Sequence, residues 1–281
     1  MPGYDLSRHL SELAEQGFTI VADALGAQEL EATRQAAIGL LDAEEEVARS
    51  TSTQTVNLRS AHAIVGKHPH FYEFYLNLPV MQIVRAVLGD GAMLYDGNIR
   101  VPMPTGGREP AKGFQVHVDR EEYTVLPFAD GRHYPVALNV VWCLVDFTVE
   151  NGSTLLWPGS HLSCQVPDPD QESVGDTVQV EARAGAAIVW DAALWHQGGV
   201  NRSASPRWSV IAYYLRPWLK GKSDSVRMLP PDAVRSMSDE AKRLVGILPA
   251  PPDYSEVKAL SPEEIQALSL EERKVLGFAV Y

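Results

Sequence analysis

The sequence predicts a mainly β fold with flanking helices, in which the two antiparallel sheets of a jelly roll enclose a ligand or metal site. The middle of the chain, residues 92–218, is broken by Gly, Pro, Asn and Asp at strand-length intervals. It contains a mostly apolar run, Val136–Val145, and an alternating run that starts at Arg207. Residues 1–91 and 219–281 show helical patterns instead. We therefore expect a β core with helical ends that buttress the larger sheet.

Five segments of the two flanks are predicted to be helices: Ser7–Glu15, Gln28–Arg49, Leu78–Leu88, Ser238–Val245 and Ser261–Leu276. The third should stop at Gly89–Gly91. The last begins with Ser261-Pro-Glu-Glu264, which combines a capping serine, a proline at the first helical position and a carboxylate three residues on. The acidic patch Asp42–Glu46 is expected to be a solvated helix face rather than a binding site.

Length and composition favour one enzyme-sized domain over residues 1–281, because 45% of the residues are hydrophobic and can supply a sizeable core. The net charge of −12 and the lack of a basic stripe argue against a nucleic-acid partner. No apolar segment approaches membrane-spanning length, and no signal peptide is visible. With two cysteines, one of them (Cys143) in a predicted core strand, we expect a reduced cytoplasmic protein, a monomer or homodimer.

Three residues could share one metal ion: His117, Asp119 and His196. On a strand, positions two apart point to the same face, which allows His117 and Asp119 to bind together. His196 follows a second apolar run, Ala186–Trp190, and could come from a neighbouring strand. Two imidazoles and one carboxylate with positions left open form the facial triad of non-haem Fe(II) oxygenases. The His-x-Asp pair alone is a weak signal in a chain with eight histidines.

Arg207 begins an alternating run that places Ser209, Ile211 and Tyr213 on its own face of a predicted strand. Both faces of this run are rich in aromatic and β-branched residues, which indicates that the strand is buried on both sides. A buried arginine needs an anionic partner, and a carboxylate matches the guanidinium fork best. Ser209 could add its hydroxyl to the same carboxylate.

Five motifs together resemble the phytanoyl-CoA dioxygenase family: His117-x-Asp119, Asn151-Gly-Ser-Thr154, Trp157-Pro-Gly-Ser-His161, His196-x-Gly198 and Arg207, eleven residues after His196. The resemblance runs from about Asn98 to Trp218, roughly half of the chain, and is specific only in combination. The family belongs to the Fe(II)- and 2-oxoglutarate-dependent oxygenases. Its fold is the double-stranded β-helix, a cupin-like form of the jelly roll.

By position, the resemblance implies that His117, Asp119 and His196 are the iron ligands and that Arg207 clamps the distal carboxylate of 2-oxoglutarate. Further polar contacts to this cosubstrate would come from five residues: Gln115, Asn139, Thr154, Ser209 and Arg100. Gln115 has independent support because it alternates onto the face of His117. An unpaired Asn139 amide would be costly in an apolar strand. For Thr154, a local hydrogen bond explains the hydroxyl nearly as well.

The implied reaction uses O₂ and 2-oxoglutarate to oxidise a substrate, and it releases succinate and CO₂. Hydroxylation is the commonest outcome, although desaturation, epimerisation, epoxidation and ring formation use the same iron site. Related halogenases lack the carboxylate and bind chloride in its place, so Asp119 argues against halogenation. The chain has no basic cluster suited to coenzyme A phosphates apart from Arg216, Lys220 and Lys222. Bacterial relatives of this size often modify small natural products, so the resemblance leads us to expect a small metabolite, as in natural-product biosynthesis, rather than an acyl-CoA.

Two other classes of protein stay open. A redox-inert metal hydrolase could hold Zn(II) and a water with the same two histidines and one aspartate, but Arg207 and Thr154 would then have no reason to lie together. A non-catalytic jelly roll that only binds a ligand would not need all three metal ligands. Among the other histidines, His161 is expected to be a structural turn residue. His62, His68, His70 and His133 are expected at the surface or in local hydrogen bonds.

Overall fold

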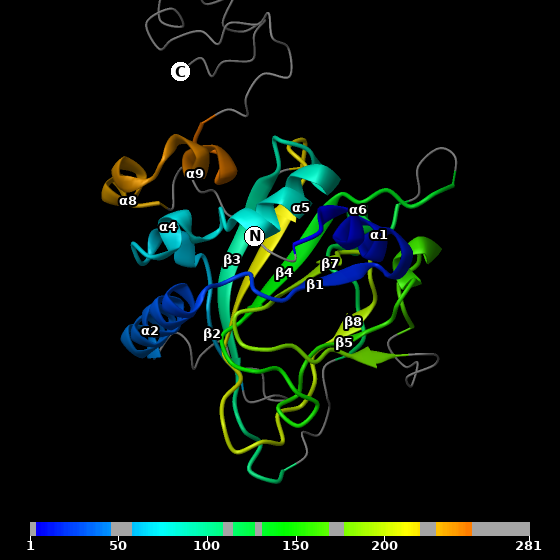
Figure 1. The fold of residues 1–281 in the computed structure, drawn as a ribbon, viewed down its shortest axis with the longest axis horizontal. Helices are drawn as coiled ribbons and strands as arrows, with labels where there is room; N and C mark the ends of the chain where they lie inside the picture. Colours follow the sequence, from blue (N-terminus) through cyan, green and yellow to red (C-terminus); the bar gives the residue numbers. More distant parts are fainter. Residues whose placement is uncertain are drawn as a thin grey trace, which may run out of the picture. The chain divides into compact units, whose positions relative to one another are not determined.

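Two antiparallel sheets form the core of the computed structural model, which describes residues 4–45, 58–108, 115–126, 131–168, 177–219 and 229–248 (Figure 1). The large sheet has the strand order β1 (Phe18–Val21), β7 (Ala187–Asp191), β4 (Ala137–Cys143), β9 (Ser209–Leu215), β3 (Met93–Pro102) and β2 (Leu58–Ala61). The small sheet has the order β6 (Val178–Gln179), β5 (Leu155–Leu156) and β8 (His196–Gln197). The predicted jelly-roll fold is confirmed.

The helices are short: α1 (Leu6–Gln16), α2 (Ala27–Ala43), η1 (Ile64–Gly66), α4 (Phe71–Phe74), α5 (Leu78–Leu88), α6 (Glu121–Thr124), η2 (Ser160–Ser163), α8 (Pro231–Ser236) and α9 (Asp239–Leu244). The prediction for α5 is confirmed residue for residue, and α1 and α9 lie within one residue of their predicted ends. The predicted helix Gln28–Arg49 matches α2 at its start, but α2 ends at Ala43, and residues 46–49 lie outside the described residues. The predicted helix Ser261–Leu276 also lies outside them.

The N-terminal region is not purely helical, which corrects the prediction for residues 1–91. It contributes β1 and β2, which pair with β7 and β3 at opposite edges of the large sheet. Each strand has only four residues, too few for a periodic pattern, and each partner is distant in sequence. Strand preference in such segments depends on tertiary pairing more than on the local sequence.

Part of the acidic patch is paired rather than simply solvated. Asp42 and Glu44 lie 3.2 Å and 2.9 Å from the side-chain nitrogens of Arg59 and Lys67. These pairs are partly exposed, so each contributes little to stability.

The large sheet separates two cores because successive residues of a strand point to opposite faces. On β4, Val140 and Trp142 belong to the core beneath the helices, whereas Val141 and Cys143 belong to the core between the sheets. The same alternation along β9 places Ser209, Ile211 and Tyr213 on one face, as the sequence predicted, and they line a cavity. The strand pattern thus fixes which side chains can form a site.

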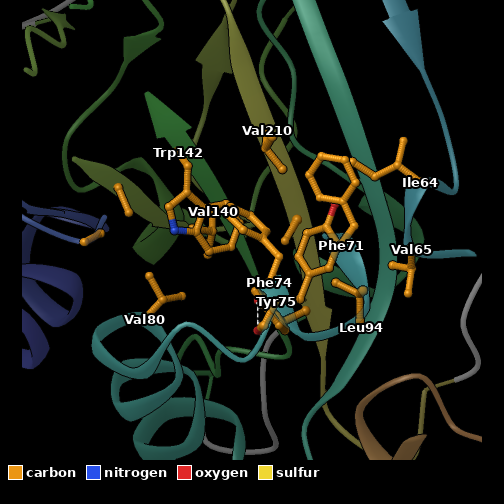
Figure 2. Packing of buried hydrophobic residues seen from close by; sticks show 14 of the residues in the cluster. Ile64, Val65, Phe71, Phe74, Tyr75, Val80, Leu94, Val140, Trp142 and Val210 are labelled. Carbon is orange, nitrogen blue, oxygen red and sulfur yellow. Dashed lines mark hydrogen bonds between the residues drawn. The ribbon is translucent and has the colours of Figure 1, made fainter. Parts of the chain in front are cut away.

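Aromatic side chains fill the core beneath the helices (Figure 2). The rings of Phe74 and Tyr75 pack edge-on against Trp142, with centroids 4.9 Å and 6.0 Å away. Gly97 on β3 leaves room for Tyr75, since a Cβ at position 97 would collide with the tyrosine ring and hydroxyl. The hydroxyl of Tyr214 donates a hydrogen bond of 2.7 Å to the backbone carbonyl of Tyr75. The hydroxyl of Tyr75 itself is buried without a hydrogen-bond partner.

We expect replacement of these two tyrosines by phenylalanine to have different effects on the free energy of unfolding. Tyr214→Phe removes a buried hydrogen bond and should lower the free energy of unfolding by about 0.5–1.5 kcal/mol. Tyr75→Phe removes a hydroxyl without a partner and should leave the free energy of unfolding unchanged or slightly raised. Denaturant unfolding of the two variants beside the wild type measures both values. Equal destabilisation by the two substitutions would contradict this hydrogen-bond assignment.

Candidate metal centre

A cavity of about 560 Å³ lies against the inner face of the large sheet. Its wall includes side chains from β3, β4, β7 and β9, together with His196 of β8 and the segment that carries His117 and Asp119. The lining includes all four residues that alternation placed on one face of the strand: Arg207, Ser209, Ile211 and Tyr213. The cavity therefore contains both the predicted metal ligands and the predicted carboxylate clamp.

His117 and His196 are held side by side by their backbones. They face each other in an isolated antiparallel bridge, in which each N–H donates to the carbonyl of the other at 3.0 Å and 2.9 Å. Their ring centroids lie 4.2 Å apart. The expected strand through His117 and Asp119 is thus reduced to one bridge, because the N–H of Asp119 donates instead to the carbonyl of Ala192, at 3.1 Å.

The three predicted ligands converge. Oδ2 of Asp119 lies 3.4 Å from Nε2 of His196, and Oδ1 lies 4.0 Å from Nε2 of His117. The candidate ligand atoms of the three side chains lie within 4.8 Å of one another, and no other group of three His, Cys, Asp or Glu in the described part of the chain is so close. Atoms that each lie about 2.1 Å from one ion are separated by roughly 3–4 Å, so the group needs only small adjustments to hold a metal.

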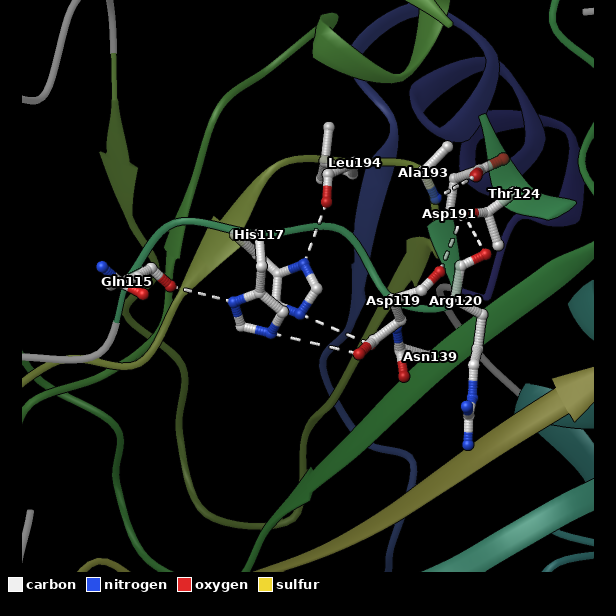
Figure 3. A network of polar contacts seen from close by, with 10 residues as sticks. Gln115, His117, Asp119, Arg120, Thr124, Asn139, Asp191, Ala193 and Leu194 are labelled. Atoms are coloured by element: carbon white, nitrogen blue, oxygen red, sulfur yellow. Dashed lines mark hydrogen bonds and ion pairs between the residues drawn. The ribbon is translucent and has the colours of Figure 1, made fainter. Parts of the chain in front are cut away.

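Both histidines present Nε2 to the shared point because Nδ1 is occupied (Figure 3). Nδ1 of His117 lies 2.9 Å from the carbonyl of Gln115, and Nδ1 of His196 lies 2.9 Å from the carbonyl of Leu194. A carbonyl only accepts hydrogen bonds, so Nδ1 carries the proton and Nε2 keeps its lone pair. This is the tautomer that a metal-binding histidine requires.

Asp119 is kept ionised and in place by its neighbours. Burial raises the pKa of the Asp119 carboxyl, but His196, His117 and the amide of Asn139 more than offset it and hold that pKa well below its usual value. The amide of Asn139 donates to Oδ2 of Asp119 at 2.7 Å. For His117, burial and then His196 lower the pKa, which favours the neutral ring. A carboxylate and neutral imidazoles are the forms that bind metals.

Arg207 is buried just before β9, with 7% of its surface exposed. Nη1 donates to the carbonyl of Gly152, the guanidinium lies 4.7 Å from the centre of the Phe147 ring, and Nε has no hydrogen-bond partner. Burial lowers the pKa of Arg207 to about 10, Cys143 offsets this effect only in part, and no carboxylate among the described residues does so. A buried guanidinium with an unused donor and no counterion fits an anionic ligand.

Backbone packing closes the wall beside Arg207. A Cβ on Gly152 would collide with the backbone of Val200, and one on Gly199 would collide with the backbone of Gly152 and Ser153. Gly152 also has a φ of +72°, which disfavours other residues. Gly152, from the Asn151-Gly-Ser-Thr154 motif, and Gly199, next to the His196-x-Gly198 motif, thus let their loops touch directly. The carbonyl of Gly152 also holds Arg207.

The five other predicted contacts divide into three groups. Thr154, Ser209 and Arg100 line the cavity, although the hydroxyl of Ser209 donates to the carbonyl of Arg100 at 2.8 Å. Asn139 lines it too, but its amide is directed to Asp119. Gln115 is exposed and absent from the cavity wall. The alternation argument fails for Gln115 because the segment before His117 is not a paired strand.

The sequence reasoning missed a buried pair beside the metal group. Nε2 of His133 lies 2.9 Å from Oδ2 of Asp191, and their side chains are only 3% and 5% exposed. His133 was expected at the surface or in a local contact, whereas its partner is 58 residues away. The signal for Asp191 was a carboxylate directly after the apolar run Ala186–Trp190, where an unpaired charge would be costly.

The polypeptide matches the model of the family described as phytanoyl-CoA dioxygenase (PhyH) over residues 13–209. The uncharacterized protein Rv1501 of Mycobacterium tuberculosis is 28% identical over 234 residues, 82% of this chain and 82% of that protein. Dioxygenase af480 of Aspergillus fumigatus is 26% identical over 179 residues, 63% of this chain and 55% of the relative.

Within the described residues, no helix has both the length and the apolar character needed to cross a membrane.

The fold is also found among solved structures. The epimerase SnoN, in complex with Fe³⁺, alpha ketoglutarate and nogalamycin RO, is similar with a TM-score of 0.58 and 22% identity, over 75% of this chain and 83% of that one. The family match covers well over half of the sequence. The chain therefore belongs to the phytanoyl-CoA dioxygenase family, whose members are Fe(II)- and 2-oxoglutarate-dependent oxygenases.

Proposed function

We propose that this protein is a non-haem Fe(II)- and 2-oxoglutarate-dependent dioxygenase, acting as a single oxygenase domain, that hydroxylates a small metabolite in natural-product biosynthesis. One observation carries the proposal: the His117–Asp119–His196 group lines the same cavity as a buried Arg207 that has no carboxylate partner in the described part of the chain. A metal site alone would not need the arginine. The two together suit a dicarboxylate that binds the metal at one end and a guanidinium at the other.

In this proposal, Nε2 of His117, Nε2 of His196 and the carboxylate of Asp119 would hold Fe(II). The carbonyls of Gln115 and Leu194 fix the imidazole tautomers, and the amide of Asn139 orients the carboxylate. When bound, Fe(II), 2-oxoglutarate and O₂ would supply the oxidising chemistry of the family, with succinate and CO₂ as coproducts. SnoN was solved with Fe³⁺ and alpha ketoglutarate, which supports this pair of cofactors.

Arg207 would receive the distal carboxylate of 2-oxoglutarate. Its guanidinium is held by Gly152 and Phe147, so little side-chain freedom is lost on binding. Thr154 and Ser209 line the same cavity and would add hydroxyl contacts. Arg100 faces this cavity as well, but it is exposed, so its proposed contribution is weaker.

The substrate would enter beside His117, whose side chain is 47% exposed, whereas that of His196 is 8% exposed. Tyr95 and Asn98 of β3 line the cavity together with Arg120 and Glu121. A volume of about 560 Å³ admits 2-oxoglutarate and a small metabolite together. These features support a small-molecule substrate.

The two other classes make different demands. A Zn(II) hydrolase would use the same three ligands but leave the buried Arg207 without a counterion. A non-catalytic jelly roll would not need two histidines held in the metal-binding tautomer. Oxygen-dependent loss of 2-oxoglutarate upon addition of Fe(II) separates the classes, because only the dioxygenase consumes the cosubstrate.

Replacement of either histidine ligand should abolish iron retention. We expect His117→Ala and His196→Ala to lose bound Fe(II) and activity while the apo-protein stays folded, with a lower melting temperature for His196→Ala because that ring is buried. His62→Ala is the matched control because His62 lines the cavity outside the metal group. Iron content after anaerobic gel filtration measures the effect. Full iron retention by both ligand variants would refute the assignment.

Arg207→Leu should weaken 2-oxoglutarate binding by about 2–5 kcal/mol, the usual cost of breaking a desolvated charge pair. Iron binding should persist. Arg207→Lys should also be impaired, because an ammonium cannot reproduce the bidentate fork. Arg100→Leu should weaken binding less, since solvent screens an exposed guanidinium. Anaerobic titration of the Fe(II)-loaded protein with 2-oxoglutarate gives the dissociation constants. A larger effect of Arg100→Leu than of Arg207→Leu would assign the clamp to Arg100.

Because Asp119 is present, we expect the wild-type enzyme to give an oxygenated or dehydrogenated product even in excess chloride. Its carboxylate fills the position that a halide takes in related halogenases. Asp119→Gly would free that position, but we expect loss of activity rather than chlorination, because a bound chloride needs supporting donors. Mass spectrometry of the products with and without chloride checks this result. A chlorinated product from the wild type would overturn the role given to Asp119.

A further inference from the structure

The turn between β7 and β8 supplies backbone carbonyls to two of the three metal-group residues. The carbonyl of Ala192 accepts the N–H of Asp119 at 3.1 Å. The carbonyl of Leu194 lies 2.9 Å from Nδ1 of His196 and fixes its tautomer (Figure 3). A shift of this turn would therefore move one ligand backbone and rotate one ligand ring.

The side chain of Asp191 shapes that turn. Its Oδ1 accepts the N–H of Ala193 at 2.8 Å, and its backbone carbonyl accepts the N–H of Leu194 at 2.8 Å. An aspartate that bonds a backbone N–H two residues on fixes the chain in a turn. Figure 3 shows Asp191 and Ala193 beside each other.

His133 provides the second contact to this carboxylate. Nε2 of His133 donates to Oδ2 of Asp191 across 2.9 Å, from a segment that precedes β4. Both side chains are nearly inaccessible to solvent, so water cannot replace a lost donor. A buried carboxylate oxygen without this donor would be left unpaired, which is strongly disfavoured and favours a change in the position of the side chain.

The other end of the turn is held by the Trp157-Pro-Gly-Ser-His161 motif. Oγ of Ser160 accepts the N–H of Trp195 at 2.9 Å. The ring of His161 packs edge-on against His133, with centroids 5.5 Å apart at 87°. This motif thus contacts both the turn and the histidine that anchors it.

We propose that His133 and Asp191 are positioning residues for the metal centre, which set its metal affinity by fixing the turn that orients Asp119 and His196. The inference rests on the proposed function, because it takes the His117–Asp119–His196 group to be the metal site. Neither residue touches the metal. Both act through the carbonyls of Ala192 and Leu194.

The competing explanation is that the pair only stabilises the fold. In that case its loss lowers the melting temperature but leaves the metal affinity of the folded protein unchanged. His9 offers a comparison, since it is a buried histidine whose side chain contacts Thr19 at 2.7 Å, Arg8 at 3.3 Å and the ring of Tyr4 rather than residues of the turn. Its replacement should lower stability alone.

The test compares full-length His133→Leu, His133→Gln and His9→Gln with the wild type, using Co(II) as the probe metal. Visible absorption gives the dissociation constant and reports the coordination geometry, and the melting temperature of each apo-protein gives stability. His133→Leu should weaken Co(II) binding about 10- to 100-fold, as loss of outer contacts does in other metal sites. His133→Gln should recover most of the affinity, because its amide nitrogen can occupy the position of Nε2.

His9→Gln should keep the wild-type affinity and spectrum despite a lower melting temperature. If His133→Leu does not fold, His133→Asn replaces it, since its shorter amide cannot reach Asp191. Wild-type Co(II) affinity and spectrum in the His133 variants would overturn the positioning role and leave the metal site intact. Absence of Co(II) binding by the wild type would overturn the metal site itself, and the positioning role with it.

Discussion

The pair of backbone hydrogen bonds between His117 and His196 is the constraint on which the site depends. This bridge joins two distant segments at a single point and sets their imidazoles 4.2 Å apart. Because it is not part of a longer ladder, it needs support from both sides. On one side the carbonyl of Ala192 accepts a hydrogen bond from the N–H of Asp119, and on the other side β8 pairs with β5. The chemistry of the site is therefore built on main-chain geometry, with the side chains added to it.

The large sheet organises the rest through its two-residue period. One face of β4 and β9 packs on helices, and the other face provides the wall of the cavity. Neighbouring residues of one strand therefore belong to different cores: Trp142 packs beneath the helices, and Val141 packs between the sheets. One face of the sheet is thus an apolar support, and the other face can carry the polar residues of the cavity. The charge of Arg207 is tolerated inside because a carbonyl and a ring contact it. These contacts offset only part of the cost of burying the guanidinium charge, so Arg207 can still bind an anionic ligand.

Much of the site could be predicted from sequence because it obeys local rules. Alternation correctly predicted that Ser209, Ile211 and Tyr213 share one face of their strand, and that face lines the cavity. The same rule failed at Gln115, where no strand pairing maintains the period. The strands β1 and β2 and the contact between His133 and Asp191 were missed, since each joins segments far apart in sequence. Local patterns cannot specify which distant partner completes a short edge strand or a buried carboxylate.

The contact between the loops that contain Gly152 and Gly199 has a consequence for variation within this fold. Neither position has space for a side chain, so this contact beside Arg207 does not tolerate substitution at either glycine. Tyr95 and Asn98 of β3 also line the cavity, and their side chains are not subject to this constraint. Substitutions that change substrate specificity can thus accumulate at the cavity-lining side chains of β3, while the contact between the two glycine loops stays fixed. We expect enzymes with this fold to differ in substrate mainly through residues of that strand.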